Sequence, residues 1–361
     1  MYSKVLKIYG WDAHCESSFV SYWKEGLEPG RVLEENRQRF RVYTARGEIG
    51  AEVSGRFRFK ACARESFPAV GDWVALRPLP GENRAIIEAV LPRKSQFIRK
   101  APGKQTEAQV VGANMDWVFV MMSLNQDFNV RRLERYLVLA WESGASPVVI
   151  LSKSDLCNDK EVAAARIRKE ALGVPIHAIS ALTGEALEEL RAYLAAGKTI
   201  ALLGSSGVGK STLVNEFLGS PSLKTQPIRA HDDRGRHTTI TRQLIVLPGG
   251  ALVLDSPGMR ELQLWEAEDG VHMAFEEIEV WASQCRFRDC THQHEPGCAV
   301  REALAAGTLN EERFQSYEKL KREMQHLIRR QDGHAERLER QRWKKLSRLA
   351  KDRAFTKRKG D

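Results

Sequence analysis

LLGSSGVGKST, residues 202–212, is the most informative stretch of this sequence. Residues 204–211 fit the pattern G-x-x-x-x-G-K-S/T, in which the backbone amides of a glycine-rich loop cradle phosphates at the start of a helix. The strand-like KTIALLG leads into this loop and the helix-like STLVNEFLG follows it, which is the context that the role requires. We predict nucleotide contacts from these residues of the loop and the first helical turn: Gly204, Ser205, Ser206, Gly207, Val208, Gly209, Lys210, Ser211 and Thr212.

The segment downstream of the loop carries two elements suited to sensing a γ-phosphate. DSPG, residues 255–258, ends a strand-like run and fits D-x-x-G. There Asp255 would hold Mg²⁺ through water, alongside the Ser211 hydroxyl, and the Gly258 amide would contact the γ-phosphate. The Thr-rich stretch RGRHTTITR lies between the two motifs. We expect Thr239, or as a second choice Thr238, to meet Mg²⁺; an ordinary surface loop is the alternative.

A base-reading motif lies upstream of the phosphate loop. SKSD, residues 152–155, follows the apolar run VVIL and matches the N/T-K-x-D pattern except at its first position. The Asp155 carboxylate can accept hydrogen bonds from guanine N1–H and the 2-amino group, neither of which adenine offers, and Lys153 would pack over the base. A second strand-like run ends in ISA, a Ser-Ala motif that would back the base. The predicted base contacts are Ser152, Lys153, Ser154, Asp155, Ser180 and Ala181.

The order of these motifs is unusual. Residues 113–265 alternate between strand-like and helix-like runs, which predicts a doubly wound α/β domain with a mostly parallel sheet. In an ordinary GTPase the phosphate loop comes first, and the base motif follows D-x-x-G. Here the base motif and the Ser-Ala motif come first. One cut and one rejoining interconvert the two orders while each strand keeps its place in the sheet, so the sequence predicts a circularly permuted GTPase.

Residues 36–98 predict a different kind of domain. Five short strand-like runs with turns near Gly47 and Gly81 suit a small β-barrel, for which an OB-fold is the best match. Basic and aromatic side chains alternate in it: Arg39, Phe40, Arg41, Tyr43, Arg56, Phe57, Arg58, Phe59 and Lys60. That mixture suits base stacking and phosphate contact. The alternative is a barrel whose aromatic side chains face inward and whose arginines are merely solvated.

A cluster of Cys and His near the C-terminus predicts a metal site. Three of the six cysteines fall within CRFRDCTHQHEPGC, which places Cys285, Cys290, His292 and Cys298 at short spacings. Three thiolates and one imidazole suit a structural tetrahedral Zn²⁺ with no open position for catalysis. His294 is a rival ligand, and free cysteines in a loop are the alternative.

Length, composition and charge limit the kinds of partner that this protein can have. The length of 361 residues suggests two or three domains. Without an apolar run of about 18 residues or a signal-peptide core, we expect a soluble, cytoplasmic protein that does not meet a membrane. Residues 311–361 hold 17 Lys or Arg against 9 Asp or Glu, a net charge of +8 out of the chain's +9. This balance favours a polyanionic partner such as nucleic acid, although a solvated charged helix would look the same. We expect a monomer, because nothing suggests a coiled-coil seam or a repeat.

The chain resembles the RsgA/YjeQ family of permuted GTPases, which act in maturation of the bacterial small ribosomal subunit. The matching text includes PAVGDWVAL, GSSGVGKSTLVN, GRHTT, DSPGMREL and the Cys/His cluster, and it spans roughly residues 30–330. The resemblance implies a multidomain α/β protein: an extension over 1–35, an OB-fold RNA-binding barrel over 36–100, a circularly permuted GTPase domain over 101–265, and a zinc-containing helical domain with a basic tail over 266–361. It also implies GTP and GDP, Mg²⁺ and one Zn²⁺ as ligands, with His292 favoured over His294. The implied partners are the 30S subunit and its 16S rRNA, with turnover stimulated by the subunit.

Two features leave room for other functions. Ser152 stands where the family has Asn or Thr, and its shorter side chain predicts weaker guanine affinity and keeps a P-loop ATPase open. Met259 follows Gly258 where Ras-like enzymes use a water-orienting Gln, so the free enzyme should be slow. The resemblance points to His237 as the catalytic substitute. Contact with RNA, or simple packing, is the alternative role for His237, and an rRNA-binding assembly factor without hydrolysis is the third function considered.

Overall fold

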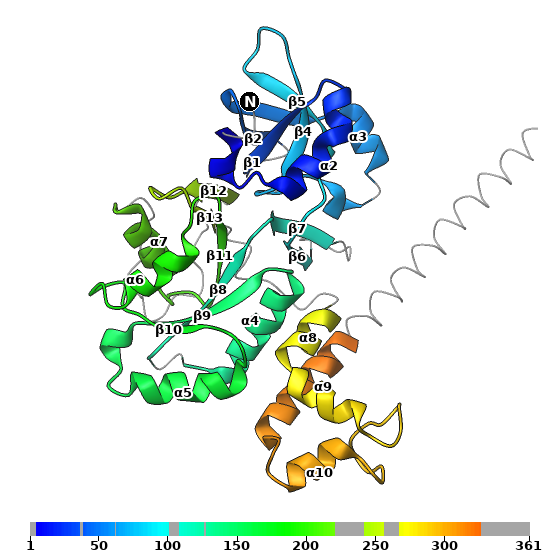
Figure 1. Cartoon of the computed structure of the whole chain (residues 1–361), viewed down its shortest axis with the longest axis vertical. Coiled ribbons are helices and arrows are strands. Elements are labelled where there is room, and N and C mark those ends of the chain that lie inside the picture. Colours follow the sequence, from blue (N-terminus) through cyan, green and yellow to red (C-terminus); the bar gives the residue numbers. More distant parts are fainter. Residues whose placement is uncertain are drawn as a thin grey trace, which may run out of the picture.

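The structure is a computed structural model, shown in Figure 1. It describes residues 5–36, 39–61, 63–100, 108–125, 128–220, 242–255 and 267–325. In chain order it contains a small β-barrel, an α/β domain and a group of helices around a Cys/His cluster. In Figure 1 the barrel and the helical group lie at opposite ends, with the α/β domain between them.

The barrel has five strands, of which four lie within the predicted range 36–98. They are β1 (Glu28–Asn36), β2 (Arg39–Thr44), β3 (Gly47–Val53), β4 (Trp73–Pro78) and β5 (Arg84–Val90). The order is β1-β2-β3-β5-β4, and β1 also pairs with β4, which closes the barrel. The fifth strand, β1, was not predicted, because it runs up to residue 36, where the strand-like pattern was expected to begin. Ahead of it, η1 (Lys7–Tyr9) and α2 (Ala13–Lys24) cover one side of the barrel, where Trp11 and Phe19 pack around Trp73.

The stretch GRFRFK does not continue the barrel as a strand, as its alternating pattern had suggested. It forms α3 (Gly55–Lys60), because the Ser54 hydroxyl accepts a hydrogen bond from the Phe57 amide at 2.9 Å and caps the helix. Phe57 packs against the barrel core, whereas Phe59 is 93% exposed. A short η2 (Arg64–Ser66) follows, and a separate hairpin, β6 (Gln96–Lys100) and β7 (Ala108–Ala113), leads to the α/β domain.

The α/β domain confirms the permuted topology. Its strands are β8 (Trp117–Ser123), β9 (Ser146–Ser152), β10 (Ile176–Ala178), β11 (Thr199–Leu203), β12 (Arg242–Val246) and β13 (Leu252–Asp255). Their order in the sheet is β10-β9-β8-β11-β13-β12; neighbours are parallel except β12, which runs antiparallel to β13. The strand before the phosphate loop, β11, is therefore central in the sheet, although three strands of the domain precede it in the chain.

Helices cover both faces of this sheet. They are η3 (Ser154–Leu156), α4 (Val130–Glu142), α5 (Lys160–Glu170), α6 (Leu187–Leu190), η4 (Arg191–Tyr193) and α7 (Lys210–Leu218). Along β8, Val118 and Val120 join the core that contains α4 and α5, while Phe119 and Met121 join the core that contains α6 and α7. This two-residue alternation is why both faces of β8 are apolar and the strand reads as one continuous hydrophobic run.

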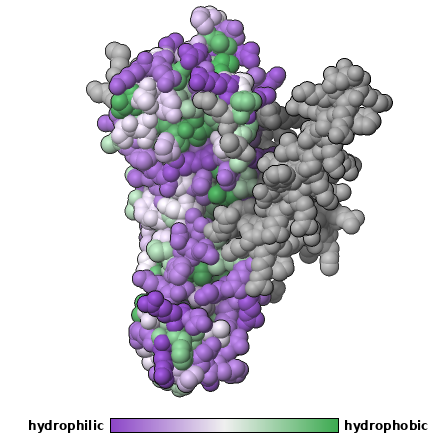
Figure 2. All heavy atoms as spheres, turned by 90° about the vertical axis from the view of Figure 1, so that its right-hand side faces the viewer, coloured by the Kyte–Doolittle hydropathy of each residue, from purple (hydrophilic) through white to green (hydrophobic). Residues whose placement is uncertain are grey.

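The helical group packs on α4. It comprises α8 (Glu268–Ala274), α9 (Glu276–Ser283), α10 (Ala299–Ala305) and a helix over 311–325. Phe275 and Tyr317 belong to the same core as Leu133 and Leu137 of α4. The buried Arg313 crosses this junction to Glu134 and Glu170 of the α/β domain. None of the described helices is long and apolar enough to cross a membrane. The face in Figure 2 is mostly hydrophilic, with hydrophobic side chains in small separate patches.

The barrel and the α/β sheet are joined by backbone pairing. Strand β1 pairs antiparallel with β12, and Arg242 of β12 forms an ion pair with Glu35 of β1 at 3.0 Å. Arg31 of β1 is fully buried at the same junction and donates to the carbonyls of Gly71 and Asn114. It also donates to the Tyr9 carbonyl and, at 2.8 Å, to the Thr199 hydroxyl at the start of β11. One side chain therefore ties four separate segments together.

Candidate nucleotide-binding and metal sites

The predicted nucleotide motifs converge on one edge of the sheet. Strands β9, β10, β11 and β13 are parallel, so their carboxyl ends share an edge, where ligands bind in open α/β folds. The base motif follows β9, the Ser-Ala motif follows β10, the phosphate loop follows β11, and Asp255 is the last residue of β13. The structure thus brings together motifs that are separated by up to about a hundred residues in the chain.

The phosphate loop has the backbone that its glycines permit. Gly204, Gly207 and Gly209 all have positive φ, at 153°, 76° and 103°. A Cβ at Gly204 would lie 2.6 Å from the Met121 carbonyl oxygen, so a larger residue there would push the loop off β8. The Lys210 ammonium donates to the carbonyls of Gly204 and Ser205, each at 2.6 Å, and so lies folded over the loop. Ser211 and Thr212 lie in the first turn of α7.

The base loop is anchored to the phosphate loop through Ser152. This side chain is only 3% exposed, and its hydroxyl donates to the Val208 carbonyl at 2.6 Å. The hydroxyl at this first position therefore braces the two loops against each other. Lys153 adopts a left-handed conformation with φ of 60°, after which the chain turns into η3. Asp155 lies exposed on that turn, and within the described residues it forms no hydrogen bond or ion pair.

The Ser-Ala loop lies against the base loop. The Ser154 amide donates to the Ile179 carbonyl at 3.0 Å, which joins the turn after β9 to the end of β10. Ser180 is fully buried, and its hydroxyl accepts a hydrogen bond from the Thr183 amide at 3.2 Å. Ala181 follows in the same turn and is partly buried against the core that contains α6 and α7. The loop that we predicted to back the base is thus part of a hydrogen-bonded turn beside Asp155.

Some predicted residues lie outside the described part of the chain. These are His237, Thr238, Thr239 and Gly258. Asp255 is described and lies at the edge of the sheet where the other motifs gather.

The four predicted metal ligands form one cluster. The ligand atoms of Cys285, Cys290, His292 and Cys298 all lie within 4.8 Å of one another. The Cys285 and Cys298 sulfurs are 3.8 Å apart, and His292 Nδ1 lies 3.6 Å from the first and 3.4 Å from the second. A tetrahedral zinc with bonds of about 2.3 Å to sulfur and about 2.0 Å to nitrogen requires S–S separations near 3.8 Å and S–N separations near 3.5 Å. The cluster therefore fits a structural zinc ion.

The choice between the two histidines is decided by the loop. His292 is half-buried with φ of 60° and points its Nδ1 at the sulfurs, whereas His294 is exposed and outside the cluster. Burial lowers the pKa of His292, which favours the neutral imidazole that a metal binds. Glu295 organises the turn by accepting hydrogen bonds from the amides of Thr291, at 2.9 Å, and Gln293, at 3.0 Å.

Two residues that shape these loops, Glu295 and Glu185, were not predicted from the sequence. The Glu185 side chain accepts a hydrogen bond from the Ser154 hydroxyl, across 31 positions of sequence. No local sequence pattern predicts the role of either glutamate, because each one makes its contacts in a turn whose shape cannot be predicted from the sequence.

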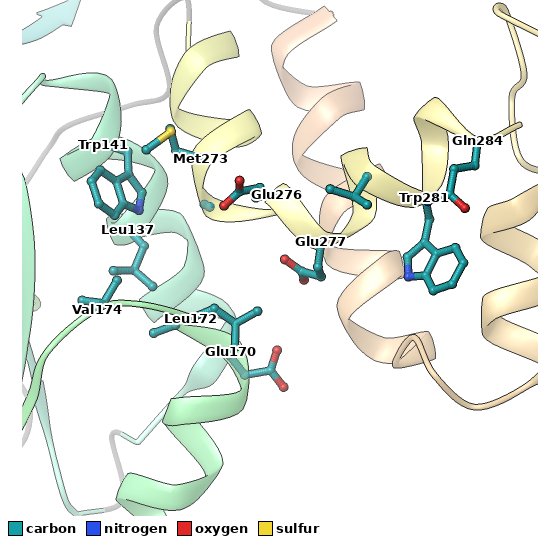
Figure 3. A pocket seen from close by; sticks show the side chains of 13 residues that line it. Leu137, Trp141, Glu170, Leu172, Val174, Met273, Glu276, Glu277, Trp281 and Gln284 are labelled. Atoms are coloured by element: carbon teal, nitrogen blue, oxygen red, sulfur yellow. The ribbon is translucent and has the colours of Figure 1, made fainter.

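An apolar groove of about 380 Å³ lies elsewhere on the molecule. Leu137 and Trp141 of α4, Val174 ahead of β10 and Trp281 of α9 are among the residues that line it, as Figure 3 shows. Val174 precedes β10, so the groove opens at the amino-terminal edge of the strands. It is on the opposite side of the sheet from the nucleotide motifs and is not the nucleotide site.

Comparison with known proteins identifies the family. The sequence model described as RsgA GTPase matches residues 90–265, a range that contains all the nucleotide motifs. A relative from Opitutus terrae named small ribosomal subunit biogenesis GTPase RsgA is 47% identical over 350 residues, covering 94% of this chain and 95% of its own. The chain belongs to the RsgA family of GTPases. It is therefore a GTP hydrolase, and the ATPase alternative left open by Ser152 is set aside.

Further members agree with this assignment. The relative from Lactiplantibacillus plantarum named small ribosomal subunit biogenesis GTPase RsgA 2 is 50% identical over 295 residues, or 82% of this chain and 83% of that one. The crystal structure of YjeQ from Thermotoga maritima superimposes with a TM-score of 0.64 at 30% identity, covering 84% of this chain and 99% of that one. The structure of YloQ, titled a circularly permuted GTPase, shares the fold with a TM-score of 0.61 at 23% identity.

A second sequence model, described as ABC transporter, matches residues 187–348. That range contains the phosphate loop but begins after β8, β9 and β10. It leaves out both base-contact loops, which the RsgA match includes.

Proposed function

We propose that this GTPase binds the small ribosomal subunit through its 16S rRNA, assists its late maturation, and leaves after hydrolysing GTP. The relatives from Opitutus terrae and Lactiplantibacillus plantarum carry small ribosomal subunit biogenesis in their names. The observation that carries the nucleotide half of the proposal is the convergence of the base, Ser-Ala and phosphate loops at one sheet edge. The protein acts as a monomer in the cytoplasm, where ribosomal subunits are assembled.

The rRNA contacts would come from three parts of the chain. On the barrel, Arg56, Arg58 and the 93% exposed Phe59 lie on α3 and offer phosphate contact and a stacking surface. In the helical group, Arg286 and Arg288 lie in the zinc loop. The segment over 326–361 adds the largest share of the excess positive charge.

The nucleotide would be held by the loops in their predicted roles. Asp155 accepts from the guanine base, Lys153 packs over it, and the amides of the phosphate loop surround the phosphates. Ser211, Asp255 and Thr239 are the residues that would hold Mg²⁺, which supplies neutralisation of phosphate charge when it is bound. Cys285, Cys290, His292 and Cys298 would hold one Zn²⁺ that fastens the helical group.

We assign His237 the role of orienting or deprotonating the attacking water. The residue after Gly258 is Met259, whose thioether can do neither. A histidine within the Thr-rich stretch offers an imidazole that can accept or donate a proton. Its action would depend on that loop being ordered by the subunit, which accounts for a slow free enzyme that the subunit stimulates.

Nucleotide hydrolysis with isolated subunits tests the proposal. Purified protein is given GTP or ATP, alone, with 30S subunits and with 50S subunits. A slow GTPase that 30S strongly accelerates and 50S does not is the expected result. Indifference to 30S would overturn the ribosomal partner. His237→Ala is expected to lower the 30S-stimulated rate by about 10²-fold or more at unchanged GTP affinity; a normal stimulated rate would remove its catalytic role.

A further inference from the structure

Glu185 lies between the two loops that are proposed to contact the guanine base. It ends the turn that follows β10, five positions beyond Ser180, and precedes α6. Its backbone carbonyl accepts a hydrogen bond from the Ser180 amide at 3.2 Å, and the Gly184 amide donates to the Ser180 carbonyl at 3.0 Å. These two bonds close the turn that carries Ala181, so the backbone of Glu185 sets the shape of the Ser-Ala loop.

The side chain of the same residue reaches the base loop. A Glu185 carboxylate oxygen accepts from the Ser154 hydroxyl at 2.6 Å. Ser154 is only 3% exposed, and this bond is its side chain's contact to the Ser-Ala turn. Removing the Glu185 carboxylate would take this charged acceptor away from a buried hydroxyl. That loss destabilises the folded protein more than the loss of an exposed hydrogen bond does.

Lys160 completes the arrangement from the far side of the base motif. Its ammonium pairs with the other Glu185 carboxylate oxygen and lies at the start of α5. Asp155 thus lies in the sequence between two residues, Ser154 and Lys160, that both contact Glu185. Consistent with these partners, the Lys160 hydrogen bond and then the Ser154 hydrogen bond lower the pKa of Glu185, so its carboxylate is ionised at neutral pH.

We propose that Glu185 is a positioning residue for guanine recognition: without touching the nucleotide, it holds the turn that presents Asp155 in register with the Ser-Ala loop. The inference rests on the proposed nucleotide site. It gives a source of rigidity for an exposed carboxylate that lies on a three-residue 3₁₀ turn. A carboxylate must be held within a few tenths of an ångström to accept two hydrogen bonds from one base edge, and η3 alone supplies little rigidity.

The test compares nucleotides that differ only at the atoms Asp155 is proposed to read. Inosine triphosphate lacks the 2-amino group of GTP and can donate only one hydrogen bond to the carboxylate. Dissociation constants for GTP and inosine triphosphate are measured with the full-length protein and with Glu185→Ala. The variant is expected to bind GTP about tenfold more weakly, the size of one lost charge-assisted hydrogen bond. Its preference for GTP over inosine triphosphate is expected to shrink by a similar factor.

A structural role alone would give a different pattern. General loosening of the domain would weaken both nucleotides equally and leave their ratio unchanged, which would overturn the proposal. Glu188→Ala is the matched control, since Glu188 is a neighbouring exposed carboxylate whose ion pair in the described part of the chain is with Arg191. It should leave both constants unchanged. When GTP hydrolysis is measured with 30S subunits over a range of GTP concentrations, Glu185→Ala should have the kcat of the wild type and a higher KM.

Two further variants keep the test decisive. Should Glu185→Ala fold poorly, Glu185→Gln retains an oxygen acceptor for Ser154 and loses the ion pair with Lys160, and a smaller change of the ratio in the same direction is expected. Ser154→Ala combined with Glu185→Ala should change the ratio no more than Glu185→Ala alone; additive losses would overturn the proposed coupling. If wild-type protein itself does not distinguish GTP from inosine triphosphate, the proposed nucleotide site fails rather than the role of Glu185.

Discussion

Replacing Arg313 by methionine is expected to loosen the helical group from the α/β domain. The guanidinium is 5% exposed and lies 3.3 Å from Glu134 and 3.4 Å from Glu170, on α4 and α5. It also pairs with Glu277 and donates to the Ala274 carbonyl at 2.6 Å. One side chain therefore links two domain elements and two elements of the helical group, with Glu134 itself only 1% exposed.

The size of the effect follows from what the substitution leaves behind. Methionine fills a similar volume, so the loss is mainly of charge. Removing one partner of a buried ion pair costs about 3–5 kcal/mol, because the remaining charge is left in a low-dielectric site. Glu134 keeps a second cation, Arg131 at 3.4 Å, and burial already raises the pKa of Glu170, which can take up a proton. We therefore expect the low end of that range, about 3 kcal/mol.

Hydrogen exchange measured by mass spectrometry can localise this loss. Amides of α9 and of the helix over 311–325 should exchange faster in Arg313→Met, whereas those of the barrel should not change. Arg322→Met is the matched control, since Arg322 has a 72% exposed side chain paired with Glu318 along the helix. Its cost should stay within about 1 kcal/mol.

The double variant Arg313→Met with Glu134→Gln tests whether an unpaired buried carboxylate causes the loss of stability. If the cost comes from a stranded buried carboxylate, neutralising Glu134 should restore part of the protection. A loss of stability below about 1 kcal/mol in Arg313→Met would contradict this account of the buried ion pairs. The account would also be contradicted if the double variant lost as much further stability as a second independent substitution would remove.

Three further predictions concern the metal, the phosphates and pH. Cys290→Ser should abolish stoichiometric zinc and raise protease sensitivity of the helical group, whereas Cys157→Ser, outside the cluster, should retain one zinc per chain by elemental analysis. Lys210→Ala should raise the Kd of GTP by roughly 10–150-fold, equivalent to about 1.5–3 kcal/mol for a charged hydrogen bond, and equal affinity in a titration would contradict the phosphate role. Burial raises the pKa of Asp12, but hydrogen bonds from Lys94 and the first turn of α2 outweigh it and lower the pKa to about 2. Because this lies below the unfolded value of about 4, the stabilisation by Asp12 should be complete above that pH and lost as pH falls through about 2. The difference in urea midpoint between wild type and Asp12→Asn should therefore shrink on acidification, and a constant difference would speak against it.

Much of the nucleotide site could be predicted because its determinants are local in sequence. The loop over 204–211 needs glycines where φ is positive, and Gly204, Gly207 and Gly209 occupy those positions. The loops follow strands, and the carboxyl ends of parallel strands share an edge, so motif order and strand pattern together placed the base and phosphate loops side by side. The metal site could be predicted for the same reason, since its four ligands lie close together in the sequence, within residues 285–298.

Local pattern misled where a short-range hydrogen bond changed the backbone. GRFRFK alternates like a strand, yet the cap by Ser54 turns it into α3. The barrel begins at Glu28 because β1 pairs with both β2 and β4 and so closes the barrel. No local pattern in residues 28–36 predicts this pairing.

Local sequence was enough to predict most of the strands and helices, the permuted order of motifs, and the side chains available for phosphate, base and zinc. Only the tertiary structure decided which distant residues hold those motifs in place: Ser152 against Val208, Glu185 against Ser154, and Arg313 across the domain junction. The physical reason is separation along the chain. Backbone preferences depend on a few neighbouring residues, whereas these contacts join positions 31 to 179 residues apart and exist only once the sheet and its helices have packed.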